Sequence, residues 1–143
     1  MIKIITIGSI KEKYLKRIKK YTNIEIIELK DEGLVEKDKA IKLEGEKIEK
    51  YLNNKDYIVT LEIEGKELTS LEFASKLDNV FIDHSNITFI IGGSYGLSAQ
   101  IKEKSNFHLS FSKMTFPHQL FRLILLEQIY RSFKINNNES YHK

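Results

Sequence analysis

The sequence contains no cysteine, no tryptophan and a single proline among 143 residues. Without cysteine there is no disulfide framework, no thiolate zinc site and no cysteine nucleophile. The four histidines, His84, His108, His118 and His142, are scattered without metal-ligand spacing, so we expect no metal site. The formal net charge is only +3, which is compatible with an RNA partner but does not require one.

Long apolar runs are also lacking. The N-terminal run that ends at Gly8 is too short for a signal peptide and is typical of a strand, so we expect a cytoplasmic protein. The apolar segment 120–126 falls far short of the roughly 20 residues that a bilayer requires, since Arg122 and Glu127 break it up. With 41% hydrophobic and 30% charged residues, the composition is that of one globular domain covering residues 1–143.

Strand-like and helix-like segments alternate along the chain. The predicted strands cover residues 1–8, 24–29, 57–63, 87–91 and 107–111. Helices are predicted over residues 10–21 and 37–52, after a capping box at Thr69–Glu72, over residues 98–104, and from Pro117 onward. This alternation indicates the α/β class with a mostly parallel sheet.

Helical spacing predicts which side chains face the core. In the second predicted helix these are Ile41, Leu43, Ile48 and Leu52, and in the third they are Leu71, Phe73, Ala74 and Leu77.

The last predicted helix is the most unusual part of the chain. Pro117 suits a first helical turn, because its φ is fixed and its missing N–H would have had no intrahelical partner. The residues that follow are apolar around nearly the whole circumference, with only Arg122 interrupting, so the helix must be covered on two sides. The second cover could come from the same domain or from a partner subunit, and we favour a symmetric dimer.

Two further patterns bear on ligands. Basic residues gather in the first predicted helix and could contact phosphates, although such a face is more often simply solvated. They are Lys11, Lys13, Lys16, Arg17, Lys19 and Lys20. Gly92-Gly93-x-x-Gly96 follows the fourth strand, where open α/β sheets bind ligands, but such a loop is equally typical of a plain turn. It does not match the dinucleotide-binding G-x-G-x-x-G pattern, and no G-x₄-G-K-[ST] phosphate loop is present, which argues against a flavodoxin-like metabolite-binding domain.

Four segments share a further pattern: Leu61-Glu-Ile-Glu-Gly-Lys66, Phe89–Ser98, Leu109–Leu120 and Tyr141-His-Lys143. Together they resemble the RlmH family, ribosomal RNA large subunit methyltransferases of the SPOUT class. The resemblance covers nearly the whole chain. It implies a SPOUT-type parallel sheet with helices on both faces and a C-terminal deep trefoil knot, over roughly residues 87–136, which is an exception to the rule against threaded chains. It also implies a homodimer that binds S-adenosylmethionine in the knot.

The activity that the resemblance implies is methylation of N3 of a pseudouridine in the helix 69 loop of 23S ribosomal RNA, on assembled ribosomes. No DNA or membrane partner is implied. The cofactor contacts carried over by motif are Leu61, Gly92, Phe111, Ser112, Lys113, Met114, Thr115 and Phe116.

The resemblance also implies that the C-terminal tail, residues 137–143, contributes to the active site. Without it, a frayed tail would be the better interpretation. For the N3 proton, the candidates are His142 as acceptor and Arg131 or Lys143 as cations that favour the deprotonated base, with Tyr141 beside them. In a dimer, the tail of one subunit could complete the site of the other. The alternative function is a non-catalytic dimeric module that binds RNA or ribosomes.

Overall fold

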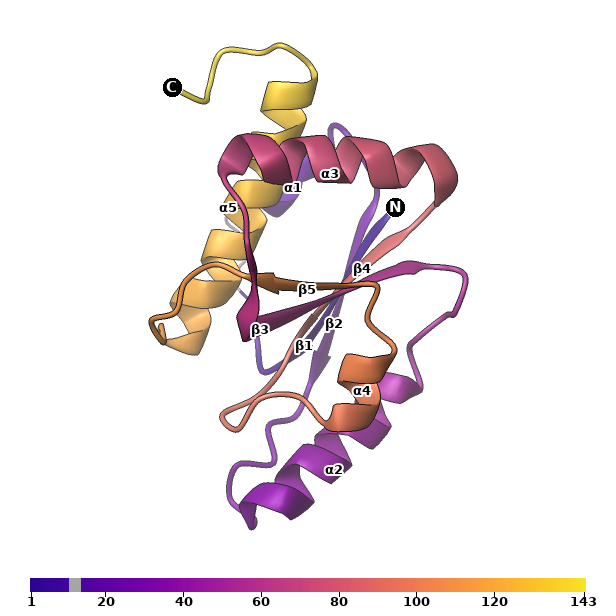
Figure 1. Cartoon of the computed structure of the whole chain (residues 1–143), viewed down its shortest axis with the longest axis vertical. Helices are drawn as coiled ribbons and strands as arrows, with labels where there is room; N and C mark the ends of the chain where they lie inside the picture. Colours follow the sequence, from indigo (N-terminus) through magenta and orange to yellow (C-terminus); the bar gives the residue numbers. More distant parts are fainter. Residues whose placement is uncertain (11–13) are drawn as a thin grey trace.

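The structure, a computed structural model, describes residues 1–10 and 14–143. Strands and helices follow one another as β1 (Ile2–Ile7), α1 (Leu15–Ile18), β2 (Ile24–Leu29), α2 (Lys37–Glu49), β3 (Tyr57–Glu67), α3 (Ser70–Asp83), β4 (Ile87–Ile91), α4 (Ala99–Glu103), β5 (Phe107–Ser110) and α5 (His118–Asn136). The strands form one five-stranded sheet in the order β2-β1-β4-β3-β5, and each neighbouring pair is parallel (Figure 1). The predicted α/β class with a parallel sheet is therefore confirmed.

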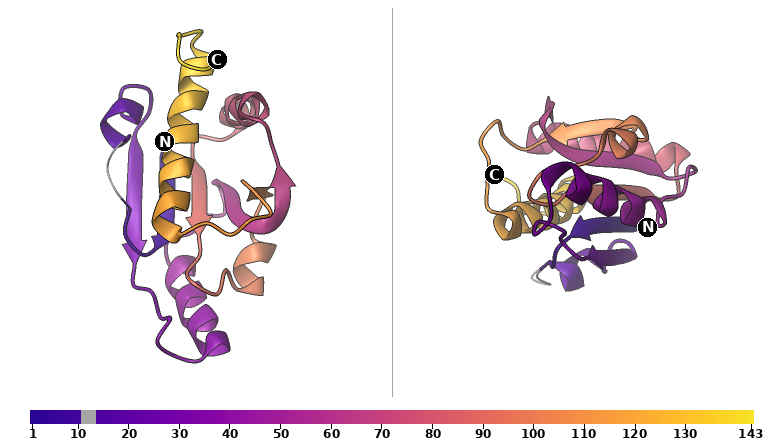
Figure 2. Two further views of the ribbon diagram at one scale, coloured as in Figure 1. Left: turned by 90° about the vertical axis from the view of Figure 1, so that its left-hand side faces the viewer. Right: turned by 90° about the horizontal axis from the view of Figure 1, so that it is seen from below.

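Helices cover both faces of the sheet because its strands are apolar on both sides, as is typical of parallel sheets. In β1, Ile2 and Ile4 belong to one hydrophobic core, whereas Ile5 and Ile7 belong to a second one. The first core is closed by α1, α3 and α5, and the second, smaller core is closed by α2 and α4 (Figure 2). This arrangement leaves the carboxyl ends of the strands free to lead into loops.

The start of α3 agrees with the sequence, but one of its predicted core residues does not. Thr69 Oγ1 accepts a hydrogen bond from the Glu72 N–H at 3.1 Å, and Glu72 Oε1 accepts one from the Thr69 N–H at 2.8 Å, which is the predicted capping box. The predicted core residues from Phe73 to Leu77 are buried, but Leu71 is 57% exposed. Leu71 lies two residues before Phe73, a rotation of about 200° around the helix, and so it faces away from the core.

The buried face of α2 also differs from the prediction. Only Ile48 of the predicted set is buried, while Ile41 and Leu43 are half-buried and Leu52 lies beyond the end of the helix. The remaining buried residues are Ala40, Glu44 and Gly45. Small residues are needed on this face, because a Cβ atom at Gly45 would lie 2.7 Å from Ser98 Oγ at the start of α4.

Other predicted boundaries change as well. Of the predicted helix over residues 10–21, the structure describes a short α1, and residues 11–13, including Lys11 and Lys13, lie outside the described residues. β5 ends at Ser110, one residue early, and β3 extends to Glu67. The added part of β3 is irregular: Leu61 and Lys66 both pair with Leu109, so residues 62–65 form a bulge.

Arg122 in α5 has the opposite environment from the one expected. Instead of interrupting an apolar surface, its side chain is buried against β1, where it donates hydrogen bonds to Thr6 Oγ1 at 3.0 Å, to the Ser9 carbonyl at 2.9 Å and to the Ile7 carbonyl. Pro117 is the residue before the helix rather than a member of its first turn. The apolar residue Leu120, by contrast, is 45% exposed.

Candidate active site

One cavity of about 440 Å³ lies between the bulge in β3 and the loops that follow β4 and β5. It is lined by residues 61–64 of β3 and by residues 91–97 and 110–116, and the first turn of α5 completes the wall. A wider groove of about 600 Å³ runs along α3 instead and reaches the starts of β3 and β5 at Tyr57 and Phe107. Ligands of open α/β sheets bind beyond the carboxyl ends, and the smaller cavity is therefore the candidate site.

The cavity brings together nearly all of the predicted cofactor residues. Those that line it are Leu61, Gly92, Phe111, Ser112, Met114, Thr115 and Phe116. Lys113 does not line the cavity and is exposed. Leu61 and Leu97 are 7% exposed and form a fixed apolar wall, whereas Met114 is 75% exposed at the rim.

The glycine loop after β4 needs its glycines. Gly96 has a φ of +86°, a left-handed conformation that L-residues avoid, and its N–H donates to the Gly93 carbonyl at 3.1 Å. A Cβ atom at Gly92 would lie 2.9 Å from the carbonyl carbon of Gly96. The loop is thus a tight turn that presents backbone to the cavity.

A buried carboxylate lies against this loop. The side chain of Glu44 is held by the Glu32 N–H, which donates to Glu44 Oε2 at 2.8 Å, while Glu44 Oε1 has no hydrogen-bond partner among the described residues. A Cβ atom at Gly93 would lie 2.8 Å from that oxygen. Burial raises the pKa of Glu44, and the nearby Asp31 adds to the effect.

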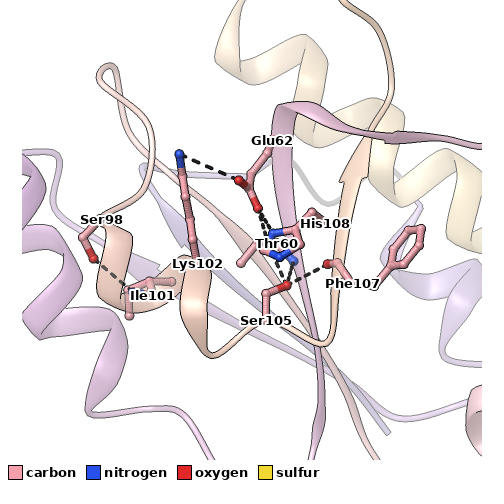
Figure 3. A network of polar contacts seen from close by, with 8 residues as sticks. All are labelled: Thr60, Glu62, Ser98, Ile101, Lys102, Ser105, Phe107 and His108. Atoms are coloured by element: carbon pink, nitrogen blue, oxygen red, sulfur yellow. Dashed lines mark hydrogen bonds and ion pairs between the residues drawn. The ribbon is translucent and has the colours of Figure 1, made fainter.

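A second carboxylate, Glu62, belongs to a polar network on the cavity wall (Figure 3). Thr60 Oγ1 donates to Glu62 Oε2 at 2.6 Å, and the same oxygen contacts His108 Nδ1. Lys102 Nζ in α4 lies 3.7 Å from the other oxygen, Oε1. Ser105, in the segment between α4 and β5, also joins the network, since its Oγ lies 2.8 Å from Thr60 Oγ1. The network therefore ties the bulge in β3 to β5 and α4.

The predicted catalytic residues cluster at the far end of α5. Arg131 Nη1 donates to His142 Nδ1 at 3.0 Å, and Arg131 Nη2 lies 2.6 Å from Glu127 Oε1. The Tyr141 hydroxyl donates to the same Glu127 oxygen at 3.1 Å, and its ring packs on Tyr130. Burial is the main cause that raises the pKa of Tyr141 to about 12, and the hydrogen bond to the Glu127 carboxylate is the second. The tail is therefore docked, not frayed; its last residue, Lys143, is exposed.

Among the residues that the structure describes, no helix is long and apolar enough to cross a membrane. The same residues contain no group of three acidic or histidine side chains placed to hold a metal ion.

Comparison with known proteins places this chain. A family model described as "Predicted SPOUT methyltransferase" matches residues 1–142. The chain belongs to the SPOUT methyltransferase family. Relatives from Methanococcus vannielii and Methanococcus maripaludis (strain C5) are 55% and 54% identical to it over 99% of both chains. A relative from Clostridium botulinum (strain Alaska E43) is 47% identical, again over 99% of both chains, and is named ribosomal RNA large subunit methyltransferase H.

In this SPOUT chain the two predicted parts of the site stay apart. His118, at the start of α5, lines the cavity, whereas Arg131 lies thirteen residues further along the helix, a rise of about 20 Å. Figure 2 shows the 111–117 loop leading into one end of α5 and the tail leaving the other. One chain therefore brings the cofactor residues together but does not bring the tail to them.

Several residues that line the cavity of this SPOUT protein were not predicted as site residues. They are Glu62, Ile63, Glu64, Lys102 and Phe121, together with His118. The signal for Glu62 was present, since it directly follows Leu61 in a segment that resembles the family. No sequence signal pointed to Lys102, because only the fold brings α4 to β3.

Proposed function

We propose that this chain is an S-adenosylmethionine-dependent methyltransferase that modifies N3 of a pseudouridine in the helix 69 loop of 23S ribosomal RNA, on assembled ribosomes. The observation that carries the proposal is the convergence of the β3 bulge and the loops after β4 and β5 on one cavity, in a chain of this family. The substrate class follows the name of the Clostridium relative, which refers to large-subunit ribosomal RNA.

The cavity suits S-adenosylmethionine in size and chemistry. Its volume of about 440 Å³ is typical of small-molecule sites. Leu61, Leu97 and Phe116 supply apolar walls for the adenine, and the backbone of the 92–96 and 111–116 loops offers N–H and C=O groups to its edge. When bound, the cofactor supplies a methyl group on a sulfonium, so the chain's main task is to align that group with N3.

We further propose that residues 87–136 form the deep trefoil knot expected of the family. Both the 92–96 loop and the 111–116 loop belong to this segment and line the cavity. A threaded chain would hold these loops together before the cofactor binds, which lowers the entropic cost of binding.

The tail supplies groups for the N3 proton and for the charge on the base. Because arginine only donates, the Arg131 N–H points at His142 Nδ1, and the neutral imidazole carries its proton on Nε2. His142 therefore accepts the N3 proton through Nδ1 only once that atom leaves Arg131. The cations Arg131 and Lys143 favour the deprotonated base, and Tyr141 positions Arg131, whose Cζ lies 4.8 Å from its ring centroid.

A homodimer would complete the site. If two copies of α5 pack against each other about a two-fold axis perpendicular to the helices, the two helices run antiparallel. The tail of each chain then lies beside the partner's cavity. Leu120, 45% exposed near the cavity end of α5, offers apolar surface for such a contact. The composite site explains why cavity and tail lie apart in one chain.

The RNA would approach across α1 and the tail. Arg17 Cζ lies 5.7 Å from the ring centroids of Tyr14 and of Tyr130, and Tyr130 packs edge-on against Tyr141. The exposed Lys16, in the same helix, therefore belongs to a basic surface that continues toward the proposed catalytic groups. Such cations bind phosphates without reading sequence.

The test is transfer of labelled methyl from S-adenosylmethionine to ribosomes from a strain that lacks this gene, followed by mass mapping of the product. We expect one methyl group on N3 of a pseudouridine in the large-subunit RNA, and none with Gly92→Val, since a Cβ atom there meets Gly96 and Leu97. The proposal is wrong if no transfer occurs to ribosomes, subunits or free RNA.

A non-catalytic module that binds RNA or ribosomes is the second candidate, and the separation of tail and cavity within one chain favours it. Under this alternative, ribosome association measured by sedimentation is the same for the wild type and Gly92→Val, and neither protein transfers methyl.

A further inference from the structure

Glu62 and Lys102 form an opposite-charge pair on the wall of the cavity. The two residues come from different elements, the bulge in β3 and the helix α4, and Figure 3 shows the two side chains approaching each other. Lys102 Nζ lies 3.7 Å from Glu62 Oε1, which is longer than a hydrogen bond. The Glu62 side chain is 11% exposed and that of Lys102 is 39% exposed, so the pair is accessible but not freely solvated.

The two oxygens of Glu62 have different surroundings. The Thr60 hydroxyl donates to Glu62 Oε2 at 2.6 Å, which is shorter than its 2.8 Å contact with Ser105 Oγ, as expected for a carboxylate acceptor. His108 Nδ1 contacts the same oxygen. Oε2 is therefore occupied by two partners, and these hold the carboxylate in one orientation.

Glu62 Oε1 retains accepting capacity, and Lys102 retains donors. Among the described residues, the long contact between Oε1 and Lys102 Nζ is the one polar contact that either atom makes. An ammonium group has three donors and a carboxylate oxygen has two acceptor sites, so both groups can bind a ligand without giving up an existing hydrogen bond.

We propose that Glu62 and Lys102 form a clamp for the amino-acid end of the cofactor, which rests on the proposed function. Lys102 Nζ donates to the ligand's α-carboxylate, and Glu62 Oε1 accepts from its α-ammonium group. The two charges of an α-amino acid lie close together. The charged atoms of Glu62 and Lys102 are 3.7 Å apart, so each can pair with the opposite charge of the ligand. Because both the clamp and the zwitterionic amino-acid end have no net charge, binding leaves neither charge of that end without a partner.

The clamp predicts a specificity. The apolar wall at Leu61 and Leu97 contacts adenosine in any ligand that carries it, whereas the clamp acts only on ligands with an amino-acid end. S-adenosylhomocysteine carries this end, and 5′-methylthioadenosine has the same nucleoside and thioether without it. The comparison of these two ligands isolates the clamp.

The experiment is calorimetric titration of both ligands into the full-length protein and its variants. We expect the wild type to bind S-adenosylhomocysteine at least about tenfold more tightly than 5′-methylthioadenosine. Lys102→Met and Glu62→Gln should each reduce the affinity for S-adenosylhomocysteine about tenfold and change that for 5′-methylthioadenosine less than about twofold. The unchanged affinity for the second ligand shows that a variant is folded, and the more exposed Lys102 makes its variant the safer test.

Two matched controls separate the clamp from general charge effects. Lys104→Met removes a cation from the end of the same helix, where it pairs with Glu49, and Glu67→Gln removes an exposed carboxylate at the end of β3, outside the cavity lining. Neither should change the preference between the two ligands. Equal weakening of both ligands in Lys102→Met, or an unchanged preference, overturns the clamp alone. A wild type that binds neither ligand overturns the proposed cofactor as well.

Discussion

Arg122 is a residue whose environment the sequence misrepresents. Its guanidinium satisfies the Ile7 and Ser9 carbonyls and Thr6 Oγ1 at the end of β1, so it ties α5 to β1. Hydropathy treats arginine as a surface residue, and the pattern 120–126 predicts a break in an apolar helix. Arg122 is instead buried and anchors α5, because its N–H groups bind backbone carbonyl oxygens at the end of β1.

Removal of this anchor should be costly. Arg122→Met keeps the aliphatic stem but leaves the buried Ile7 carbonyl and the part-buried Ser9 carbonyl without their donors, and we expect the free energy of unfolding to fall by about 2–4 kcal/mol. Urea denaturation measures the change, with Lys39→Met on the exposed face of α2 as the control. A loss no larger than that of the control would mean that water replaces the guanidinium at these carbonyls.

Glu44 gives a prediction about pH. Its pKa is raised in the folded state by burial, so ionisation opposes folding: its stabilising contribution is present below about pH 4.5 and is lost as the pH rises through the higher folded pKa. Glu44→Gln is neutral throughout. The variant should therefore gain stability relative to the wild type as the pH rises from about 4.5 to neutral.

Thermal unfolding across that pH range measures the difference, and Glu46→Gln, at an exposed position of the same helix, is the control. A stability difference between Glu44→Gln and the wild type that does not depend on pH would mean that the carboxyl group has the same pKa folded and unfolded.

At the scale of elements, the bulge in β3 links the fold to the site. Residues 62–65 leave the ladder between β3 and β5 at Leu109, and this departure turns Glu62 and Glu64 toward the cavity. Gly65 permits it, because its Cα lies close against the backbone of β5: an added Cβ would be 2.7 Å from the His108 carbonyl oxygen. The cavity wall thus depends on one close contact between two strands.

Gly65→Ala should displace that wall. We expect a loss of about 1–3 kcal/mol in the free energy of unfolding, as for other overpacked sites, together with weaker binding of S-adenosylhomocysteine. Chemical denaturation and calorimetry give the two values. In the control Gly33→Ala, the atoms nearest to the added Cβ belong to the side chains of Asp31 and Ser94, which can move. Normal ligand affinity in Gly65→Ala would mean that the bulge does not shape the site.

The elements also show how far the sequence could be predicted. The predicted strands 24–29 and 87–91 match β2 and β4 residue for residue, because both are short β-branched runs with clear polar or glycine ends. The end of β3 was missed because residues 62–67 are mostly polar and pair through an irregular register. Cavity residues within the family-like segments, such as Leu61 and Gly92, were predicted. Lys102 was not, because it is far from Glu62 in the sequence and only the fold brings the two side chains together.

At the scale of the whole molecule, the position of the tail determines how many chains the reaction needs. Arg131 and His142 lie about 20 Å along α5 from the cavity end of that helix, so neither reaches a methyl group held in the same chain's cavity. The wild type should therefore be a dimer in which each site is shared. This leads to a complementation experiment with two variants that are inactive for different reasons.

Gly92→Val obstructs the cavity and leaves the tail intact, whereas His142→Ala removes a tail group and leaves the cavity intact. Each alone should be inactive in methyl transfer. When they are co-expressed with different affinity tags, a mixed dimer pairs the intact cavity of one chain with the intact tail of the other. Random pairing should then restore about a quarter of wild-type activity, because half of the dimers are mixed and each has one working site of two. Purified mixed dimers without activity would mean that each tail acts on the cavity of its own chain. The tail would then have to leave Arg131 and move along the length of α5.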